Sequence, residues 1–288
     1  MHLYQILSTE YYVSMDSWIR SLIVLLATGL VGFLGVWQAS ALVSTRGVLG
    51  PTLFQSISPI SSLFAIALTI GVASVIAGFV AKYTSTTTGM FILGFSLFAM
   101  AMKLEGMQEL VMNNGNFNVL ALEAVFISVL VLLGTLIVFA IGGPLKCISK
   151  PTPEDHLAKQ VGIAFVISLA ILPVIWFIAT TPAKGQVLGA SAVGGVIIAL
   201  LSRQFLHSMQ PIILFALPIF WGGIGYLIGL LLGDTSPVSF AQQKVSSLLF
   251  PMPIEYAAGI IIGLALGLGW TSSDEENTQT VTEKKVAP

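Results

Sequence analysis

Charge is what this sequence has least of. Charged residues make up 9% of the 288-residue chain, whereas 56% are hydrophobic. A typical soluble domain carries about 25% charged residues. Twelve Lys/Arg and thirteen Asp/Glu are too few to cover the surface of a soluble protein of this length. The mean hydropathy of +0.94 agrees with that deficit, so the composition predicts a polytopic membrane protein.

Cysteines, histidine clusters and phosphate-binding loops are also scarce or missing. The single Cys147 excludes an internal disulfide framework and a Cys-based zinc site, and the three histidines lack metal-ligand spacing. No GxxxxGK motif is present, which argues against an ATP-driven pump. A net charge of −1 provides no basic surface for nucleic acid. We therefore expect no enzymatic activity, no cofactor, and no nucleotide or nucleic-acid partner.

Eight apolar stretches qualify as membrane-spanning helices, although two of them are short. A spanning helix needs about 20 mainly apolar residues. Without water each segment must satisfy its own backbone, so the predicted fold class is an all-α polytopic transmembrane bundle. Pro173 should kink the fifth span. The predicted spans are Trp18–Val43, Ile60–Lys82, Thr87–Met102, Asn118–Ile141, Val161–Ala179, Val187–Leu201, Pro211–Leu232 and Ile254–Trp270.

Outside the membrane domain, residues 18–270, little of the chain is left to fold. Residues 1–17 form a short N-terminal segment at the cytoplasmic side or the membrane surface. Residues 271–288 are polar and acidic with little to bury, so we expect this tail to be disordered. Helical spacing of apolar residues in 104–111 and 241–249 predicts two short amphipathic helices on the bilayer surface.

The distribution of positive charge predicts the orientation. Eight spans place both termini on one side, and eight of the twelve Lys/Arg belong to that side. Positive residues favour the cytoplasm, so both termini are expected there, in a bacterial inner membrane. The eight are Arg20, Lys82, Lys146, Lys150, Lys159, Arg203, Lys284 and Lys285; the four opposite are Arg46, Lys103, Lys184 and Lys244.

The first span also resembles a secretory signal peptide in part. From Met15 onward the chain has a positive residue, Arg20, then an apolar core at 22–37 and an A-x-A site at Ala39–Ala41. The core is at the long end for a signal peptide, and fourteen residues precede Met15. We expect the helix to be retained; cleavage would leave seven spans.

The spacing of the spans suggests an internal repeat. Spans one to three start near residues 18, 60 and 87, and spans four to six near 118, 161 and 187. The units would be 18–103 and 118–202, with 211–270 as a partial third. An odd number of spans per unit inverts the second copy, as in many secondary transporters. The alternative is that similar helix and loop lengths produce this spacing without any repeat.

Under the repeat hypothesis, spans three and six would contain the substrate path. Short or glycine-interrupted segments at matching places in inverted repeats indicate binding sites. The candidate residues are Gly94, Ser96, Ser191, Gly194 and Gly195.

Two acidic residues lie near the starts of spans. Glu123 is the one charge clearly inside a span, where charge is costly. It could serve a proton- or cation-linked step on the substrate path, pair with Lys103, or occupy an interfacial structural position. Glu255 starts the eighth span, where a carboxylate suits the helix N-terminus, so we expect it to cap that helix.

Two glycine faces predict close helix packing. GxxxGxxxG spacing lets helix backbones approach one another within the membrane. The simplest use is that spans seven and eight pack on each other, and the alternative is dimerisation. The residues are Gly225, Gly229 and Gly233 on span seven, and Gly259, Gly263 and Gly267 on span eight.

Two functions stay open at this point. The first is a structural or assembly subunit, whose partners would be membrane lipid and other membrane helices or a second copy. The second is a small-solute permease in which spans three and six line the path. The scarcity of charge within the spans slightly favours the first.

Overall fold

The computed structural model describes residues 17–145, 157–206 and 210–286, and for 271–286 the backbone alone. Eight helical spans in these ranges are long and apolar enough to cross a membrane, which confirms the predicted all-α polytopic bundle. The described chain has no β-strand and a single isolated bridge, between Val43 and Leu49.

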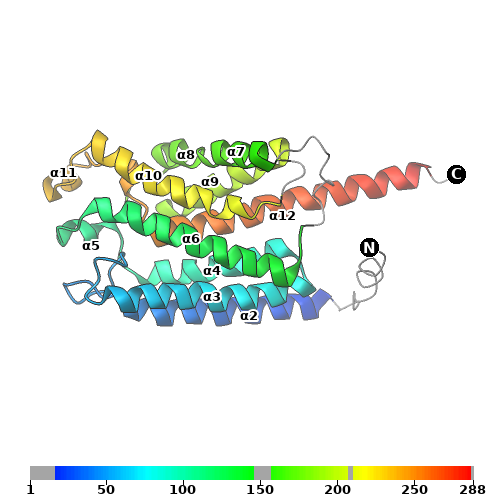
Figure 1. Ribbon diagram of the computed structural model, residues 1–288, viewed down its shortest axis with the longest axis horizontal. Coiled ribbons are helices and arrows are strands. Elements are labelled where there is room, and N and C mark those ends of the chain that lie inside the picture. Colours follow the sequence, from blue (N-terminus) through cyan, green and yellow to red (C-terminus); the bar gives the residue numbers. More distant parts are fainter. Residues whose placement is uncertain (1–16, 146–156, 207–209, 287–288) are drawn as a thin grey trace.

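The helices lie side by side along one long axis (Figure 1). Their bounds agree with the predicted spans to within a few residues at most ends. In chain order they are α2 (Ser17–Gln38), η1 (Ala39–Ala41), α3 (Pro59–Tyr83), α4 (Thr86–Lys103), α5 (Met107–Met112), α6 (Phe117–Gly142), α7 (Leu157–Ser168), α8 (Ile171–Ile178), α9 (Lys184–Phe205), η2 (Ile213–Phe215), α10 (Leu217–Leu232), α11 (Pro237–Ala241), η3 (Ser247–Leu249) and α12 (Pro253–Val286).

The fifth span is interrupted, as its proline predicts. The structure divides it into α7 and α8, with a turn at Leu169 and Ala170. Pro173 lies four residues after Leu169. Its ring cannot accept the carbonyl of that residue, and it has no N–H to donate. The predicted kink at Pro173 is confirmed.

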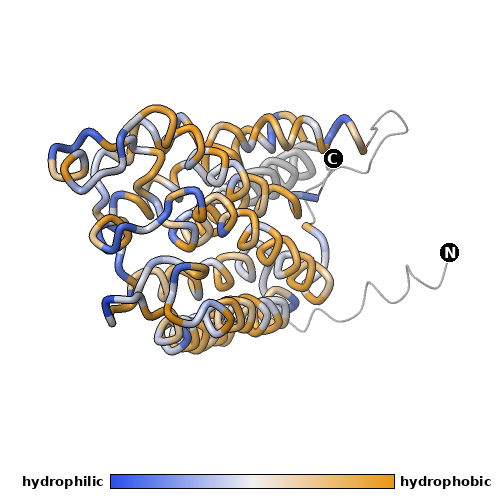
Figure 2. The backbone as a smooth tube through the Cα atoms, turned by 60° about the vertical axis from the view of Figure 1, so that its left-hand side comes forward, coloured by the Kyte–Doolittle hydropathy of each residue, from blue (hydrophilic) through white to orange (hydrophobic). Residues whose placement is uncertain are grey.

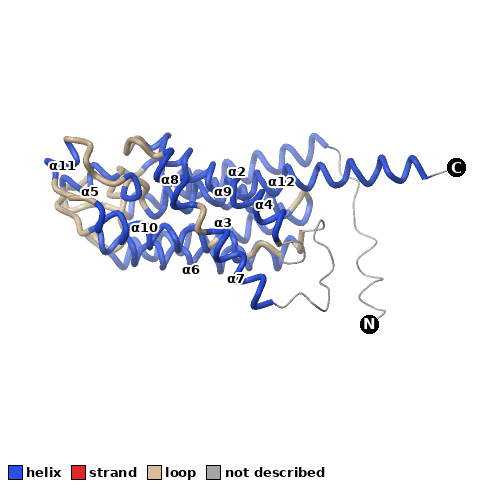
Figure 3. Tube along the Cα trace, turned by 90° about the horizontal axis from the view of Figure 1, so that it is seen from above, coloured by secondary structure: helices blue, strands red, loops and turns tan. Residues whose placement is uncertain are grey.

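The two ends of the bundle differ in character. We call one the loop end; it carries the connection 39–58, α5, α11 and η3. Helices α5 and α11 lie close together there in Figures 1 and 3. The other, the tail end, carries the tight turn between α3 and α4 and the exit of α12. Figure 2 shows hydrophobic residues along the spans and hydrophilic ones mainly in the connections. This pattern fits a membrane location.

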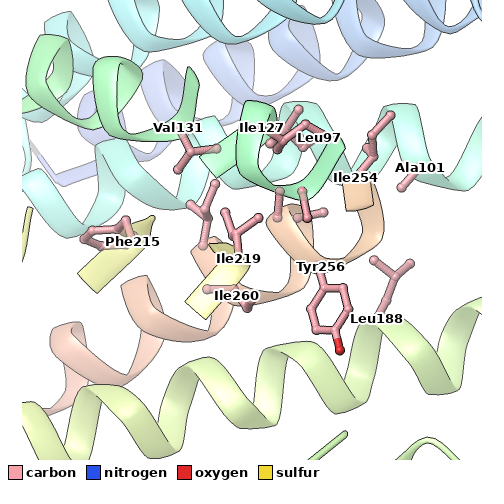
Figure 4. Close-up of a cluster of buried hydrophobic side chains, with 14 of the residues drawn as sticks. Leu97, Ala101, Ile127, Val131, Leu188, Phe215, Ile219, Ile254, Tyr256 and Ile260 are labelled. Carbon is pink, nitrogen blue, oxygen red and sulfur yellow. The ribbon is translucent and has the colours of Figure 1, made fainter. Parts of the chain in front are cut away.

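Helix α12 forms the centre of the bundle. Its apolar part, Pro253–Trp270, is the most deeply buried of the eight spans, whereas the first span is the least. It packs most extensively against α9 and α4, and it also contacts α6 and α10. Figure 4 shows the apolar layer at this junction, where buried side chains from α4, α6, α9, η2, α10 and α12 meet. The layer includes Leu97, Ile127, Val131, Ile219 and Ile260.

The glycine face of α12 meets α9, and not α10 as predicted. A Cβ built at Gly259 would lie 2.7 Å from the Leu188 carbonyl oxygen. One at Gly263 would overlap the Ala192 carbonyl, and one at Gly267 would lie 2.6 Å from the Ala199 Cβ. The predicted close approach of the α12 backbone to another helix is confirmed, whereas the predicted partner, α10, is wrong, because the glycine face meets α9.

The glycine face of α10 has partners of its own. Gly225 faces Leu172 of α8, and Gly229 faces Leu249 of η3, each with a built Cβ less than 3 Å from a side-chain carbon. A Cβ built at Gly233 would lie 3.4 Å from the Lys244 carbonyl oxygen. These glycines make room for η3 and α8 instead of for α12.

The C-terminal segment differs from expectation. Helix α12 continues to Val286, so residues 271–286 are helical where their composition predicted disorder. In Figure 1 this part extends beyond the bundle at the tail end. Residue 270 therefore marks the end of the apolar part of the helix and not the end of the helix.

The short connecting helices are partly as predicted. Residues 107–112 form α5, as the apolar spacing indicated. Residues 241–249 are not one helix, because α11 ends at Ala241 and Gln243 has a positive φ of 56°. A left-handed residue interrupts helical hydrogen bonding, and only a 3₁₀ turn, η3, follows.

The proposed repeat stays a prediction. Helix α2 packs mainly against α4 and α3, whereas α6, which would correspond to it, packs mainly against α3 and α10. The helices of the first unit thus contact one another more than those of the second.

The contact between α9 and α12 generates a stability test. A Cβ at Gly195 would lie 2.6 Å from the Ile260 carbonyl oxygen and 2.8 Å from the Leu264 nitrogen, both backbone atoms. We expect Gly195→Ala to lower the unfolding free energy by about 1–3 kcal/mol, because the helices must separate. Gly189→Ala, on the same helix with nothing within 4 Å of its built Cβ, is the control and should be neutral or slightly stabilising. Equal effects in a denaturation titration in detergent would contradict this packing.

Candidate functional site

A buried charged network joins three helices at the loop end. Lys184, the first residue of α9, donates from Nζ to the carbonyl oxygens of Ala101, at 2.5 Å, and Leu104. The same Nζ lies 3.8 Å from Oε1 of Glu255. The side chain of Glu255 is 5% exposed and that of Lys184 is 24% exposed. The pair therefore connects the end of α4 to the starts of α9 and α12.

Glu255 also caps α12. Its Oε2 accepts a hydrogen bond from the backbone nitrogen of Met252 at 2.8 Å. Met252 directly precedes the helix, and Glu255 is its third residue. This is the geometry in which an N3 glutamate satisfies the N-cap N–H group. The capping role predicted for Glu255 is confirmed.

The C-terminus of α4 and the N-terminus of α12 favour the two charges of this pair. A lysine is stabilised near a helix C-terminus and a glutamate near an N-terminus. Lys184 binds carbonyl oxygens at the C-terminal end of α4, and Glu255 lies in the first turn of α12. The backbone thus offsets part of the desolvation cost that makes buried ion pairs expensive.

Two tyrosines lie beside this pair. The Tyr226 and Tyr256 rings meet edge to face, with centroids 5.9 Å apart, and both are fully buried. The Tyr226 hydroxyl donates to the Pro251 carbonyl oxygen at 2.5 Å, just ahead of α12. The Tyr256 hydroxyl has no hydrogen-bond partner within the described residues. The tyrosines extend the polar cluster toward α10.

Glu123 anchors the long connection 39–58. Its side chain is fully buried, and Oε1 accepts backbone hydrogen bonds from Leu53 at 3.0 Å and Phe54 at 2.8 Å. Lys103, one of the partners considered for it, has no ion pair in the described chain and is exposed. Oε2 has no hydrogen-bond partner among the described residues. This arrangement agrees with a structural role for Glu123, one of the alternatives considered from the sequence. Its Oε2 takes no part in these hydrogen bonds.

Further side chains hold the same connection to α5 and the start of α6. Arg46 and Glu109 form an ion pair at 3.0 Å, and Glu109 also accepts from Ser44 at 2.8 Å. The turn at residues 44–47 of the connection ends at Gly47, whose φ of 80° suits glycine. Two polar pairs complete the attachment: Thr45 with Asn113, and Gln55 with Asn116.

Asp234, outside the spans, forms a local cap. Its Oδ2 accepts from the Ser236 hydroxyl at 2.6 Å and from the Ser239 hydroxyl at 2.7 Å. These hydrogen bonds, with that from Ser236 the largest cause, hold the pKa of Asp234 below its ordinary value. The carboxylate is ionised at neutral pH and organises the start of α11.

The predicted path residues lie in helix contacts. A Cβ built at Gly94 would be 2.9 Å from Ile262 of α12, and one at Gly195 would be 2.6 Å from the Ile260 carbonyl. Gly194 is covered by Ile171 of α8. Ser96 and Ser191 are fully buried.

Both of these hydroxyls donate within their own helices, Ser96 to the Leu93 carbonyl and Ser191 to the Val187 carbonyl. Two cavities, of about 620 Å³ at the tail end and 260 Å³ at the loop end, have other linings. The structure thus brings Gly94, Gly194, Gly195, Ser96 and Ser191 into contacts between helices, while Glu123 lies apart from them at the loop end.

Metal chemistry and known relatives contribute no further assignment. Within the described ranges, no three His, Cys, Asp or Glu side chains come together as a metal site. No protein-family model matches the chain, and no curated protein or solved structure has significant similarity to it. The function is therefore inferred from the packing and charges of this chain alone.

Lys184 should matter more than an ordinary surface lysine. Lys184→Met leaves Glu255 buried without its counter-charge, and we expect the unfolding free energy to fall by about 3–5 kcal/mol. The double variant with Glu255→Gln should recover part of this loss, because no buried charge remains. Lys103→Met, at the exposed end of α4, is the matched control and should change little. Additive losses in the double variant, measured by denaturation in detergent, would show that the two groups do not interact.

Glu123 should control the accessibility of the connection 39–58. We expect Glu123→Leu to speed tryptic cleavage after Arg46 by at least about tenfold, because two hydrogen bonds to a charged acceptor are lost. Glu123→Gln keeps an acceptor oxygen and should have a smaller effect. Glu105→Gln, an exposed glutamate nearby, is the control. Unchanged cleavage of Glu123→Leu would mean that the connection is held without this carboxylate.

Proposed function

We propose that this protein is a non-enzymatic structural or assembly subunit of a membrane. The observation that carries the proposal is the placement of the residues expected to line a path. Gly94, Ser96, Ser191, Gly194 and Gly195 lie where two helices touch, and a Cβ at any of the three glycines would meet another helix. A solute path requires space beside such residues, and here neighbouring helices occupy it.

The rest of the bundle supports a rigid role. The apolar layer around α12 is buried, and its members come from α4, α6, α9, η2, α10 and α12 itself. Interiors packed in this way resist compression and transmit strain. The loop end adds a fixed cap, because the connection 39–58 is attached through Glu123, Glu109 and Asn116.

The outer helices are where partners would bind. The first span is the least buried, and its outward side chains are apolar. These face lipid, other membrane helices or a second copy of the chain. The most exposed are Trp18, Leu25, Leu26, Phe33 and Trp37.

The type of membrane and the orientation of the protein in it are also proposed. The two-to-one excess of Lys/Arg that the sequence assigns to the side of both termini supports a cytoplasmic location for them. We place the protein in a bacterial inner membrane with the loop end on the opposite side.

A small-solute permease is the second candidate, and one observation favours it. Oε2 of Glu123 and Oε1 of Glu255 are buried without hydrogen-bond partners in the described chain. Intramembrane ionisable groups often mark ion or substrate pathways. The ion pair of Glu255 with Lys184 and the loop contacts of Glu123 supply structural reasons for both carboxylates.

Water access to the helix contacts separates the two functions. With Cys147 replaced by serine, we expect Ser96→Cys and Ser191→Cys to resist a membrane-impermeant maleimide in sealed and in broken vesicles. Both should react fully after denaturation, because the thiols are then exposed. Gln242→Cys, at an exposed position of the loop end, is the positive control.

Rapid labelling of either position in folded protein would favour the permease. In addition, a structural subunit extracted in mild detergent should belong to a particle whose protein mass exceeds that of its own 30.5 kDa chain. A particle of monomer size with labelled thiols would reject the proposal.

A further inference from the structure

Helices α2 and α4 enclose an open cavity at the tail end. The two helices run in the same direction, since Gly32 faces Phe95 and Gly35 faces Ser96 and Met100. At Gly35 the backbones touch, because a Cβ there would overlap the Ser96 carbonyl oxygen. Toward their N-termini the helices leave a space of about 620 Å³. The space is therefore a wedge, closed in mid-bundle and open at the tail end.

The polar lining of the wedge suits a phosphate group. Arg20, Ser21 and Thr28 of α2 face Thr84, Ser85 and Thr88 of the turn that starts α4. Five of these six side chains carry hydroxyls. Those of Ser21 and Thr84 donate to the backbone carbonyls of Ser17 and Val80, which leaves those of Thr28, Ser85 and Thr88 to donate to phosphate oxygens. Among the described residues, the lining contains no acidic side chain to repel an anion.

Arg20 provides the positive charge. Its guanidinium forms no hydrogen bond or ion pair with the described residues, and its Nε is shielded from solvent. Arginine remains charged at any ordinary pH and matches phosphate with a two-pronged set of N–H donors. Because no described residue neutralises it, the Arg20 guanidinium can bind an anionic ligand.

The start of α4 reinforces that charge. Ser85 is its N-cap and accepts from the Thr88 nitrogen at 3.1 Å. The Ser85 hydroxyl also lies 2.8 Å from that of Thr88 and 2.9 Å from that of Thr87. The N-terminus of an 18-residue helix carries partial positive charge, which favours anions.

The position of the wedge favours a lipid as the carrier of the phosphate. Trp18 and Tyr83 are exposed at the same end, where aromatic rings mark the membrane interface. From Arg20 the lining continues through Val24 and Leu25 to Thr28. Eight residues of helix correspond to about 12 Å. The cavity therefore has a polar mouth at interface level and an apolar wall that leads into the hydrocarbon.

We propose that this wedge binds the phosphate group of an anionic membrane phospholipid. Arg20 contacts the phosphate, Ser85 and Thr88 donate to its oxygens, and an acyl chain follows Val24 and Leu25. The assignment is independent of whether the protein is a structural subunit or a permease.

The test measures binding of dioleoylphosphatidylglycerol to the full chain in detergent, through the rise in thermal unfolding midpoint. We expect Arg20→Ala to raise the half-saturating lipid concentration at least about tenfold, the loss typical of a charge-assisted contact. Arg20→Gln, which keeps the side-chain length, should lose as much binding, and Arg20→Lys should lose less. Lys103→Ala, an exposed cation at the loop end, is the control and should bind like the wild type.

Inorganic phosphate serves as the second ligand and identifies the source of the group. An Arg20-dependent response to the lipid and not to inorganic phosphate supports the lipid site. If inorganic phosphate without lipid gives an Arg20-dependent rise as large as that given by the lipid, the lipid assignment is overturned and the ligand is a soluble phosphate. A response unchanged in both Arg20→Ala and Arg20→Gln, or lost equally in Lys103→Ala, would overturn the site. Midpoints without ligand show whether each variant is folded.

Discussion

The close approach of α9 and α12 is the constraint on which the rest of the bundle depends. Inside a bilayer, helices gain no hydrophobic free energy by leaving lipid for one another, so association relies on dense packing. Gly195, Gly259 and Gly263 remove the side chains that would keep the two backbones apart. Once α12 is seated on α9, its other faces are covered by α4, α6 and α10. The same glycines leave no room for a path beside Ser191.

The few charges are placed where the helices leave backbone groups unsatisfied. Glu255 accepts the N–H that precedes α12, and Lys184 covers carbonyl oxygens at the end of α4. Glu123 accepts two N–H groups of the connection 39–58. In each case a charge that would be costly in the membrane meets a backbone dipole or a free polar group. The loop end is thereby fastened, while the tail end keeps an open wedge beside Arg20.

The sequence predicts local features of this fold better than contacts between distant segments. Hydropathy over about 20 residues identifies the eight spans, because burial in lipid depends on the segment itself. Pro173 and Glu255 act within one helical turn, so their roles were also predictable. Glycine spacing predicts that another helix backbone approaches closely, but it does not identify that helix. The prediction that Gly259 and Gly263 meet α10 was therefore wrong, since they meet α9. The contact of Lys184 with α4 joins segments about 80 residues apart, and nothing in the local pattern indicates it.

A dry, glycine-packed centre is the main claim of this account. Hydrogen–deuterium exchange of the full chain in lipid nanodiscs tests it most directly, because water must reach a backbone amide for exchange to occur. We expect the amides of residues 188–199 in α9 and 257–268 in α12 to stay protected for hours. Exchange of either segment within minutes, while α3 and α6 remain protected, would show water between these helices and contradict the packing described.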